Sequence, residues 1–304
     1  MYKKFRYQPL SRKIFIIFNT LFLLFLTVCI LAPLLKIIFA SLSESSFLQG
    51  NLKIFNKDLD FSGYKFLWNK KDTGFSIFEI KEYEYYIFRP NFYVSIFTTL
   101  ATAFIGTFVS GIAAYILMQK EMPGNRLFGR MMLIAALFGG FSIPEFLMYK
   151  QLHLLNTHIP VILPLCFNYL NILFLKIYFE RLPKDLLDAA EIDGCTPLSK
   201  FFKVIVPASK TPLTVVWMFF ASSAWNEYLR YYMFISDMKK YNLQNILRMW
   251  FNDDGINIYL GMGVSWHQAI SSNIVICMIP AIFICLFSVK YFIPAFNDIF
   301  RQKN

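Results

Sequence analysis

The segment Asp188-Ala-Ala-Glu-Ile-Asp-Gly-Cys-Thr-Pro-Leu-Ser-Lys-Phe-Phe-Lys-Val-Ile-Val-Pro207 is a polar interval between two long apolar stretches. Pro183, just before it, suits the first turn of a helix. Gly194 is expected to end that helix, because glycine adopts the left-handed conformation of a helix C-terminus without steric penalty. Thr196 is a suitable N-cap for a second helix, with Pro197 in its first turn. The 188–207 segment therefore predicts two short helices joined at a glycine corner.

The apolar residues of these two predicted helices recur at helical spacing. In each helix they fall on one face, at intervals of three and four residues, so both helices are predicted to be amphipathic. They are Leu182, Leu186, Ala189 and Ala190 in the first helix and Leu198, Phe201, Phe202 and Ile205 in the second. Pro207 is expected to end the second helix.

The first predicted helix is acidic. An anionic lipid leaflet would repel this charge, which favours a protein partner over the bilayer surface. Charge and periodicity alone leave open the alternative of an ordinary structural loop. The acidic residues are Asp185, Asp188, Glu191 and Asp193.

The composition is that of a membrane protein. Of 304 residues, 57% are hydrophobic and 16% are charged, and the mean hydropathy is +0.47; an ordinary soluble domain has about a quarter charged residues. The formal net charge is +11, but Lys and Arg flank the apolar runs instead of forming one basic face, which argues against a nucleic-acid partner. The five cysteines include no C-x-x-C pair, so neither a zinc site nor a disulfide framework is predicted.

The apolar runs predict an all-α polytopic membrane protein with a single domain and six transmembrane helices. The run 14–35 follows a basic N-terminus and is long enough to cross a hydrocarbon core of about 30 Å. We interpret it as a retained helix with a cytoplasmic N-terminus, since a cleaved signal peptide has a shorter apolar region. Six crossings place both termini in the cytoplasm. The predicted layout is a cytoplasmic N-terminus at 1–13, spans at 14–35, 92–118, 131–149, 159–179, 212–235 and 264–289, an outer loop at 36–91, cytoplasmic helices at 183–207 and a cytoplasmic tail at 290–304.

Several polar residues within or beside the predicted spans are candidates for a solute pathway. Glu145 is an ionisable group near membrane depth, which makes it a functional candidate by default. Alternatively, Glu145 lies near the outer membrane interface or forms an ion pair within the helix bundle. The other candidates could instead form hydrogen bonds that join helices to each other. Glu227 and Arg230 are also spaced to pair with one another. The candidates are Glu145, Asn168, Asn171, Ser222, Ser223, Asn226 and Glu227.

Enzymatic motifs are missing from the sequence. The three histidines do not form H-E-x-x-H, and there is no G-x-S-x-G. The nearest approach to a phosphate-binding loop, from Gly106 to Gly111, continues with Ile112 inside a predicted span. Catalytic, metal and ATP sites are therefore not expected in this chain.

The 188–207 segment resembles the EAA signature of binding-protein-dependent ABC importer permeases, which reads Glu-Ala-Ala, then Gly, then Ile-x-Leu-Pro. Asp188 stands in place of the usual Glu and Val206 in place of Leu. Residues outside the segment are similar to the carbohydrate-uptake branch related to the maltose permease. The matching positions are Ala189, Ala190, Asp193, Gly194, Phe201 and Pro207 in the segment, and Ala113-Ala114-Tyr115, Pro123-Gly124, Gly139-Gly140, Ile143-Pro144 and Trp225-Asn226 outside it.

The resemblance implies a type I ABC importer permease fold in the cytoplasmic membrane, with an extracytoplasmic loop between helices 1 and 2. It implies a second homologous permease subunit in a heterodimer, an ATPase dimer that binds ATP and Mg, an external solute-binding protein and an oligosaccharide as solute. Gly194 would set the corner, and Asp188 and Asp193 would hold it. The residues implied in ATPase coupling are Asp188, Ala189, Ala190, Asp193, Gly194, Phe201 and Pro207.

Two other functions compete with this interpretation. An ion-driven secondary transporter would need several intramembrane charges and usually repeated halves, and the sequence offers neither. A membrane-embedded transferase would need titratable residues converging in one cavity, and no such cluster is evident.

Overall fold

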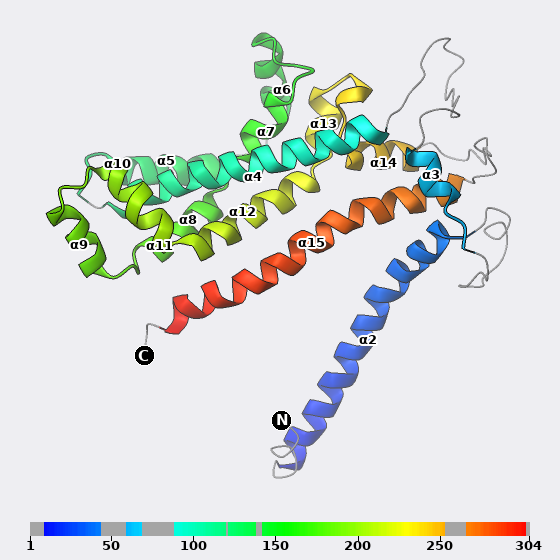
Figure 1. The fold of residues 1–304 in the computed structure, drawn as a ribbon, viewed down its shortest axis with the longest axis horizontal. Helices are drawn as coiled ribbons and strands as arrows, with labels where there is room; N and C mark the ends of the chain where they lie inside the picture. Colours follow the sequence, from blue (N-terminus) through cyan, green and yellow to red (C-terminus); the bar gives the residue numbers. More distant parts are fainter. Residues whose placement is uncertain are drawn as a thin grey trace. The chain divides into compact units, whose positions relative to one another are not determined.

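The computed structural model describes residues 9–43, 59–68, 88–119, 121–137, 142–252 and 266–301. Within these ranges every regular element is helical, as the sequence predicts (Figure 1). Two compact units are present, one from residues 1–85 and 254–276 and the other from residues 86–253 and 277–304. The helices are α2 (Leu10–Ser41), α3 (Ser62–Trp68), α4 (Phe88–Met118), α5 (Asn125–Leu137), α6 (Ser142–Gln151), α7 (Ile159–Leu165), α8 (Tyr169–Phe179), α9 (Lys184–Ile192), α10 (Pro197–Lys200), η1 (Phe201–Ile205), α11 (Val206–Ala208), α12 (Lys210–Trp225), α13 (Leu229–Phe234), η2 (Met238–Lys240), α14 (Leu243–Asn252) and α15 (Trp266–Arg301).

The first unit is held together by polar contacts around the start of α3. The Asp60 carboxylate accepts hydrogen bonds from the Ser62 hydroxyl at 2.6 Å and the Gln268 side-chain amide at 3.0 Å. Burial raises the pKa of Asp60, but these hydrogen bonds lower it by more, so its pKa lies below the usual value. A Cβ on Gly63 would lie 2.4 Å from the Ser272 hydroxyl oxygen, so glycine permits this close approach of α3 to α15.

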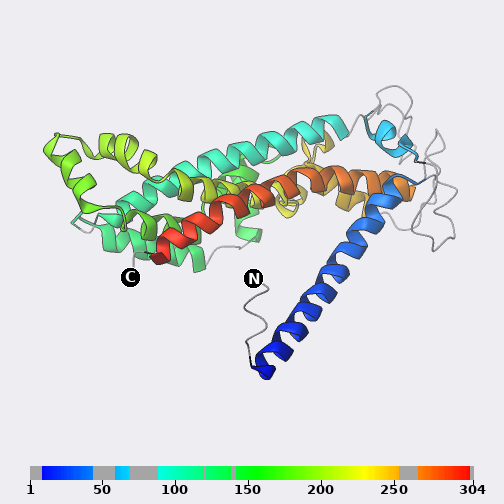
Figure 2. The ribbon, with the colours of Figure 1, turned by 60° about the horizontal axis from the view of Figure 1, so that its bottom comes forward.

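The second unit has a hydrophobic core between α4, α8 and α12. These three helices contribute Ala103, Ile172 and Phe220, each at most 1% exposed. Figure 1 and the turned view in Figure 2 both show α4 running alongside α12. A Cβ on Gly106 of α4 would lie 2.9 Å from the Phe220 ring, so this helix approach requires glycine.

Polar side chains of α4 fix the loop that follows α13. Asn91 donates to the Met238 carbonyl at 3.0 Å, and the Ser95 hydroxyl accepts from the Leu243 backbone N–H at 2.8 Å. Tyr231 and Thr98 share a hydrogen bond of 2.8 Å between their hydroxyl groups. Because Asn91, Ser95 and Thr98 are four and three residues apart, they lie on one face of α4.

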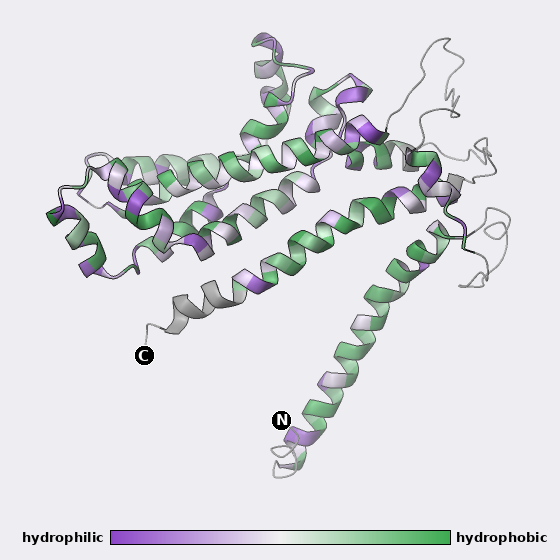
Figure 3. Ribbon diagram, viewed as in Figure 1, coloured by the Kyte–Doolittle hydropathy of each residue, from purple (hydrophilic) through white to green (hydrophobic). Residues whose placement is uncertain are grey.

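Four helical stretches among the described residues are long and apolar enough to cross a membrane, or five if a bent pair counts as one span. Figure 3 shows the first of them, α2, as predominantly hydrophobic along its length. The bent pair joins residues 197–208 to α12 at 87°. The four are Leu10–Ser41, Phe88–Met118, Ile159–Phe179 and His267–Phe292.

The predicted count of six spans stays a prediction. The third predicted span, 131–149, falls on α5 and α6, and its Gly139-Gly140 pair lies outside the described residues. Most of the predicted outer loop 36–91 also lies outside them. Helix α2 extends beyond the first predicted span at both ends, and α15 extends beyond the sixth at its C-terminal end. Helix α14 lies between the fifth and sixth predicted spans.

Candidate functional site

The predicted glycine corner is present in the structure. Helix α9 ends at Ile192, and Gly194 has the left-handed φ of +69°. The Gly194 N–H donates to the Glu191 carbonyl and the Cys195 N–H to the Ala190 carbonyl, both at 3.0 Å. These two hydrogen bonds form a Schellman motif, which satisfies the last carbonyl groups of the helix. Gly194 therefore has the role that its position in the sequence predicted.

The second helix begins as predicted and ends close to the predicted residue. The Thr196 side chain accepts from the Ser199 N–H at 3.3 Å, which caps the helix. Pro207 lies inside the last turn, α11; the helix ends one residue later, at Ala208, and the chain bends at Ser209. Residues 201–205 form a π-helical turn just before it. Pro207 lacks an N–H and its ring crowds the carbonyl four residues earlier, so a widened turn at this place lets helical structure continue.

The two helices bury different residues from those expected. Of the first predicted face, Ala190 is buried and Leu182 packs on the core, whereas Leu186 and Ala189 are exposed. Leu187 packs on the core in their place. The predicted set Leu182, Leu186, Ala189 and Ala190 was therefore only half correct.

In the second helix, Phe201 and Ile205 are buried. The Phe201 ring lies 5.4 Å from the ring of Tyr115 in α4, between centroids. Leu198 and Phe202 are exposed, although the periodicity placed them on the same face. The π-helical turn adds a residue between Phe201 and Ile205, which changes the register of the face.

Three large apolar side chains around the corner are exposed to solvent. Ile192 is 86% exposed and Leu198 67%, and Leu186 is exposed as well. Asp188 and Asp193 are also on the surface. Exposed apolar residues that form a patch beside charged ones are typical of a surface that binds another protein.

An ion pair across the corner was not predicted from the sequence. The Lys200 ammonium lies 2.5 Å from the Glu191 carboxylate, and the exposed fractions of the two side chains are 11% and 69%. The role of Asp188 and Asp193 in holding the corner, which the family resemblance implies, stays a prediction, and the Lys200–Glu191 pair is a charged contact that spans the corner. Lys200 and Glu191 are nine positions apart in the sequence, whereas side chains that pair on one helix are three or four positions apart. The contact could therefore not be predicted from their spacing.

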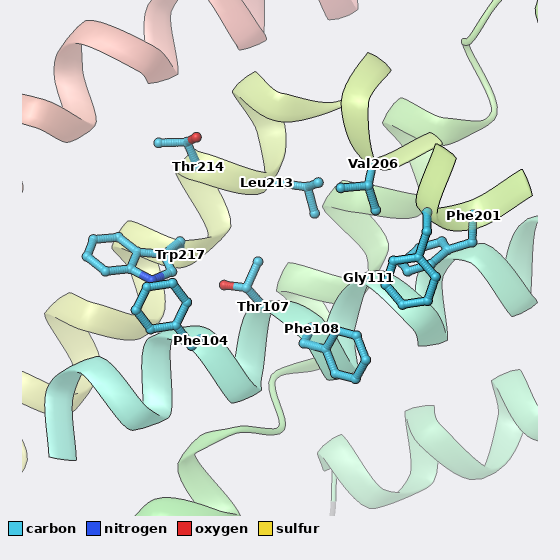
Figure 4. A pocket seen from close by; sticks show the side chains of 10 residues that line it. Phe104, Thr107, Phe108, Gly111, Phe201, Val206, Leu213, Thr214 and Trp217 are labelled. Carbon is cyan, nitrogen blue, oxygen red and sulfur yellow. The ribbon is translucent and has the colours of Figure 1, made fainter. Parts of the chain in front are cut away.

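An apolar cavity of about 420 Å³ lies beside the second helix (Figure 4). Its walls come from α4, from α12 and from the π-helical turn with α11. The Phe104 and Trp217 rings meet edge to face, with centroids 5.7 Å apart. The lining residues are Phe104, Thr107, Phe108, Gly111, Phe201, Phe202, Val206, Leu213, Thr214 and Trp217.

Glu145 of α6, the ionisable candidate for the solute pathway, is paired within the protein. Its carboxylate lies 2.5 Å from Nη1 of Arg230 in α13, and both side chains are about one-fifth exposed, at 21% and 23%. Glu227 does not form the expected side-chain pair with Arg230. Its carboxylate accepts from the Arg230 backbone N–H at 3.0 Å.

The remaining pathway candidates lie at helix ends or within helices. The Asn168 side chain caps α8 by accepting from the Leu170 and Asn171 N–H groups at 3.0 and 3.2 Å. Asn226 follows α12 and donates to the Ser222 carbonyl at 2.8 Å. Asn171 is buried and Ser223 is exposed. Asn168 and Asn226 thus have structural partners, and the assignment of the set to a solute pathway stays a prediction.

Comparisons with known proteins identify the fold and the family. Residues 127–298 match the family described as "Binding-protein-dependent transport system inner membrane component". The protein LplC of Bacillus subtilis (strain 168) is 30% identical over 237 residues, which cover 78% of this chain and 75% of LplC. The arabinooligosaccharides transport system permease protein AraQ of the same organism is 28% identical over 280 residues, covering 90% of this chain and 91% of AraQ.

A solved structure has the same fold. It is the crystal structure of a bacterial ABC transporter involved in the import of the acidic polysaccharide alginate, with a TM-score of 0.83, 25% sequence identity and coverage of 94% of this chain and 99% of that chain. The resemblance that the 188–207 segment and the Trp225-Asn226 pair indicated is confirmed, as is the permease fold. The family match covers more than half of the chain, and the match to LplC, at 30% identity, covers three-quarters of that protein. This protein therefore belongs to the family of binding-protein-dependent transport system inner membrane components.

Proposed function

We propose that this permease couples to a separate cytoplasmic ATPase through its 188–207 segment and transmits ATPase closure to the transport pathway. The exposed apolar residues at the corner carry this proposal. Ile192 and Leu198 project from a segment whose backbone is fixed by the Schellman motif. A rigid corner with exposed apolar and acidic side chains has the properties of a surface that inserts into a partner.

The proposed assembly contains a second homologous permease in a heterodimer, an ATPase dimer and an external solute-binding protein. ATP and Mg would bind to the ATPase, and both termini of this chain would lie in the cytoplasm. AraQ is named for arabinooligosaccharides and the structural relative for alginate. Those names support an oligosaccharide as the solute of this permease.

ATP-driven uptake by the reconstituted complex tests this function. We expect proteoliposomes that contain both permeases, the ATPase and the binding protein to accumulate solute only when ATP reaches the ATPase. Ionophores that collapse proton and sodium gradients should leave the rate unchanged, because the energy comes from hydrolysis. Uptake without ATP that the ionophores abolish would instead support ion-driven transport and contradict the proposal.

A further inference from the structure

Lys200 is the last residue of α10, in the first turn of the second helix of the 188–207 segment. Its side chain is largely buried, yet its ammonium reaches Glu191 in the last turn of α9. Removing an ammonium from water is costly unless a carboxylate compensates, so a largely buried lysine needs this partner. The position near the C-terminus of α9 adds a favourable interaction with the helix dipole. The pair therefore ties the first helix of the segment to the second.

Directly after Lys200 the chain is anchored on the core. Phe201 packs on Tyr115 of α4, and Ile205 is fully buried. A continuous series of contacts thus leads from Glu191 through Lys200 and Phe201 to Tyr115.

Beyond Phe201, the second helix and α4 are not closely packed. The cavity of about 420 Å³ opens between them, and its lining includes Phe108 and Gly111 of α4 and Val206 of the second helix (Figure 4). The second helix then meets α12 at the 87° bend at Ser209. Because a helix beside an open volume can move without displacing its neighbour, transmission to α4 depends on the contact of Phe201 with Tyr115 and on how firmly α9 is held to the second helix.

We propose that Lys200 and Glu191 form a clamp that makes α9 and the second helix move as one body, so that displacement of α9 reaches α4. The inference rests on the proposed coupling function and adds two positioning residues to it. Both act through the corner, and neither is required to touch the solute. The clamp differs from the Schellman motif, which shapes the backbone of the corner but does not connect it to the core.

The ratio of solute uptake to ATP hydrolysis tests the clamp in the reconstituted complex. Lys200→Met keeps most of the length of the side chain and removes its charge. We expect the ratio to fall about fivefold, the upper end of the effect of an ion pair that has one exposed partner. Glu191→Gln should lower the ratio at least as much, because it leaves a largely buried ammonium without its carboxylate. Lys200→Arg should retain most of the coupling. A loss of assembly alone would lower uptake and hydrolysis together and leave their ratio unchanged.

The double variant and a matched control make the test specific. If the two residues act as a unit, Lys200→Met combined with Glu191→Gln should be no worse than Glu191→Gln alone. Lys176→Met removes the same charge from the Lys176–Glu180 pair, which lies within α8 and its C-cap, and should leave the ratio unchanged. Glu191→Gln alters a mostly exposed side chain, so it serves as the second variant if Lys200→Met fails to fold.

The outcomes separate the clamp from the function on which it rests. If wild-type complex shows no ATP-driven uptake, both proposals are overturned. If wild type is ATP-driven and Lys200→Met and Glu191→Gln keep the wild-type ratio, only the clamp is overturned. Strictly additive losses in the double variant would likewise show that the two residues do not act together.

Discussion

Replacing Gly194 by proline is expected to leave the membrane helices folded and to abolish ATP-driven uptake. Proline fixes φ near −65°, whereas residue 194 requires +69°. It also removes the N–H that donates to the Glu191 carbonyl, so the Schellman motif cannot form. The corner is exposed and a Cβ on Gly194 would meet no atom within 4 Å, so the damage should stay local. Uptake, ATP hydrolysis and co-purification with the ATPase should be measured together.

Gly194→Ala is the matched control for this variant. Alanine retains the N–H and fits the open space, but a left-handed conformation costs it about 1–2 kcal/mol. Its uptake should fall between those of wild type and Gly194→Pro. Unchanged co-purification and unchanged uptake in Gly194→Pro would contradict the assignment of this corner to ATPase coupling.

Breaking the Glu145–Arg230 ion pair is expected to destabilise the second unit. Either Glu145→Gln or Arg230→Met leaves the other charge partly buried without its partner. Removing one partner costs about 3–5 kcal/mol when a pair is fully buried and less than about 1 kcal/mol when it is exposed. We expect about 1–3 kcal/mol here, because both side chains are about one-fifth exposed. The double variant should be more stable than either single variant, since it leaves no unpaired charge.

Thermal unfolding in detergent measures this effect, and uptake distinguishes it from a role in solute binding. In the structural role, uptake falls only as far as the amount of folded protein falls. If Glu145 instead contacts solute, Glu145→Gln should lose uptake at unchanged unfolding temperature. The double variant would then fail to recover it, and Glu145 would belong to the pathway after all.

The glycine corner is predictable from the sequence because its signals are local. Gly194 follows an amphipathic helix and Thr196-Pro197 begins another, and each signal acts within a few residues. The membrane-spanning potential of the long apolar runs can also be predicted, since length and hydropathy determine whether a helix can cross a bilayer. The family resemblance also rests on one contiguous motif and a few short ones.

The contacts between elements are not predictable in this way. Glu145 and Arg230 lie on different helices and 85 residues apart in sequence, and the helical spacing of Arg230 from Glu227 suggested the wrong side-chain partner. Pro207 correctly signals the end of its helix, which lies one residue later at Ala208, but no local signal predicts the π-helical turn that precedes it. Tertiary packing decided each of these cases.

Site-specific crosslinking at the corner tests the coupling account most directly. A photoreactive residue replaces Ile192, which is 86% exposed at the corner. In a matched variant it replaces Leu152, which is 58% exposed and lies between the third and fourth predicted spans, on the outer side of the predicted layout. The account predicts an adduct with the ATPase subunit from position 192 and none from position 152. An ATPase adduct from position 152, or none from position 192 in a complex that hydrolyses ATP, would contradict it.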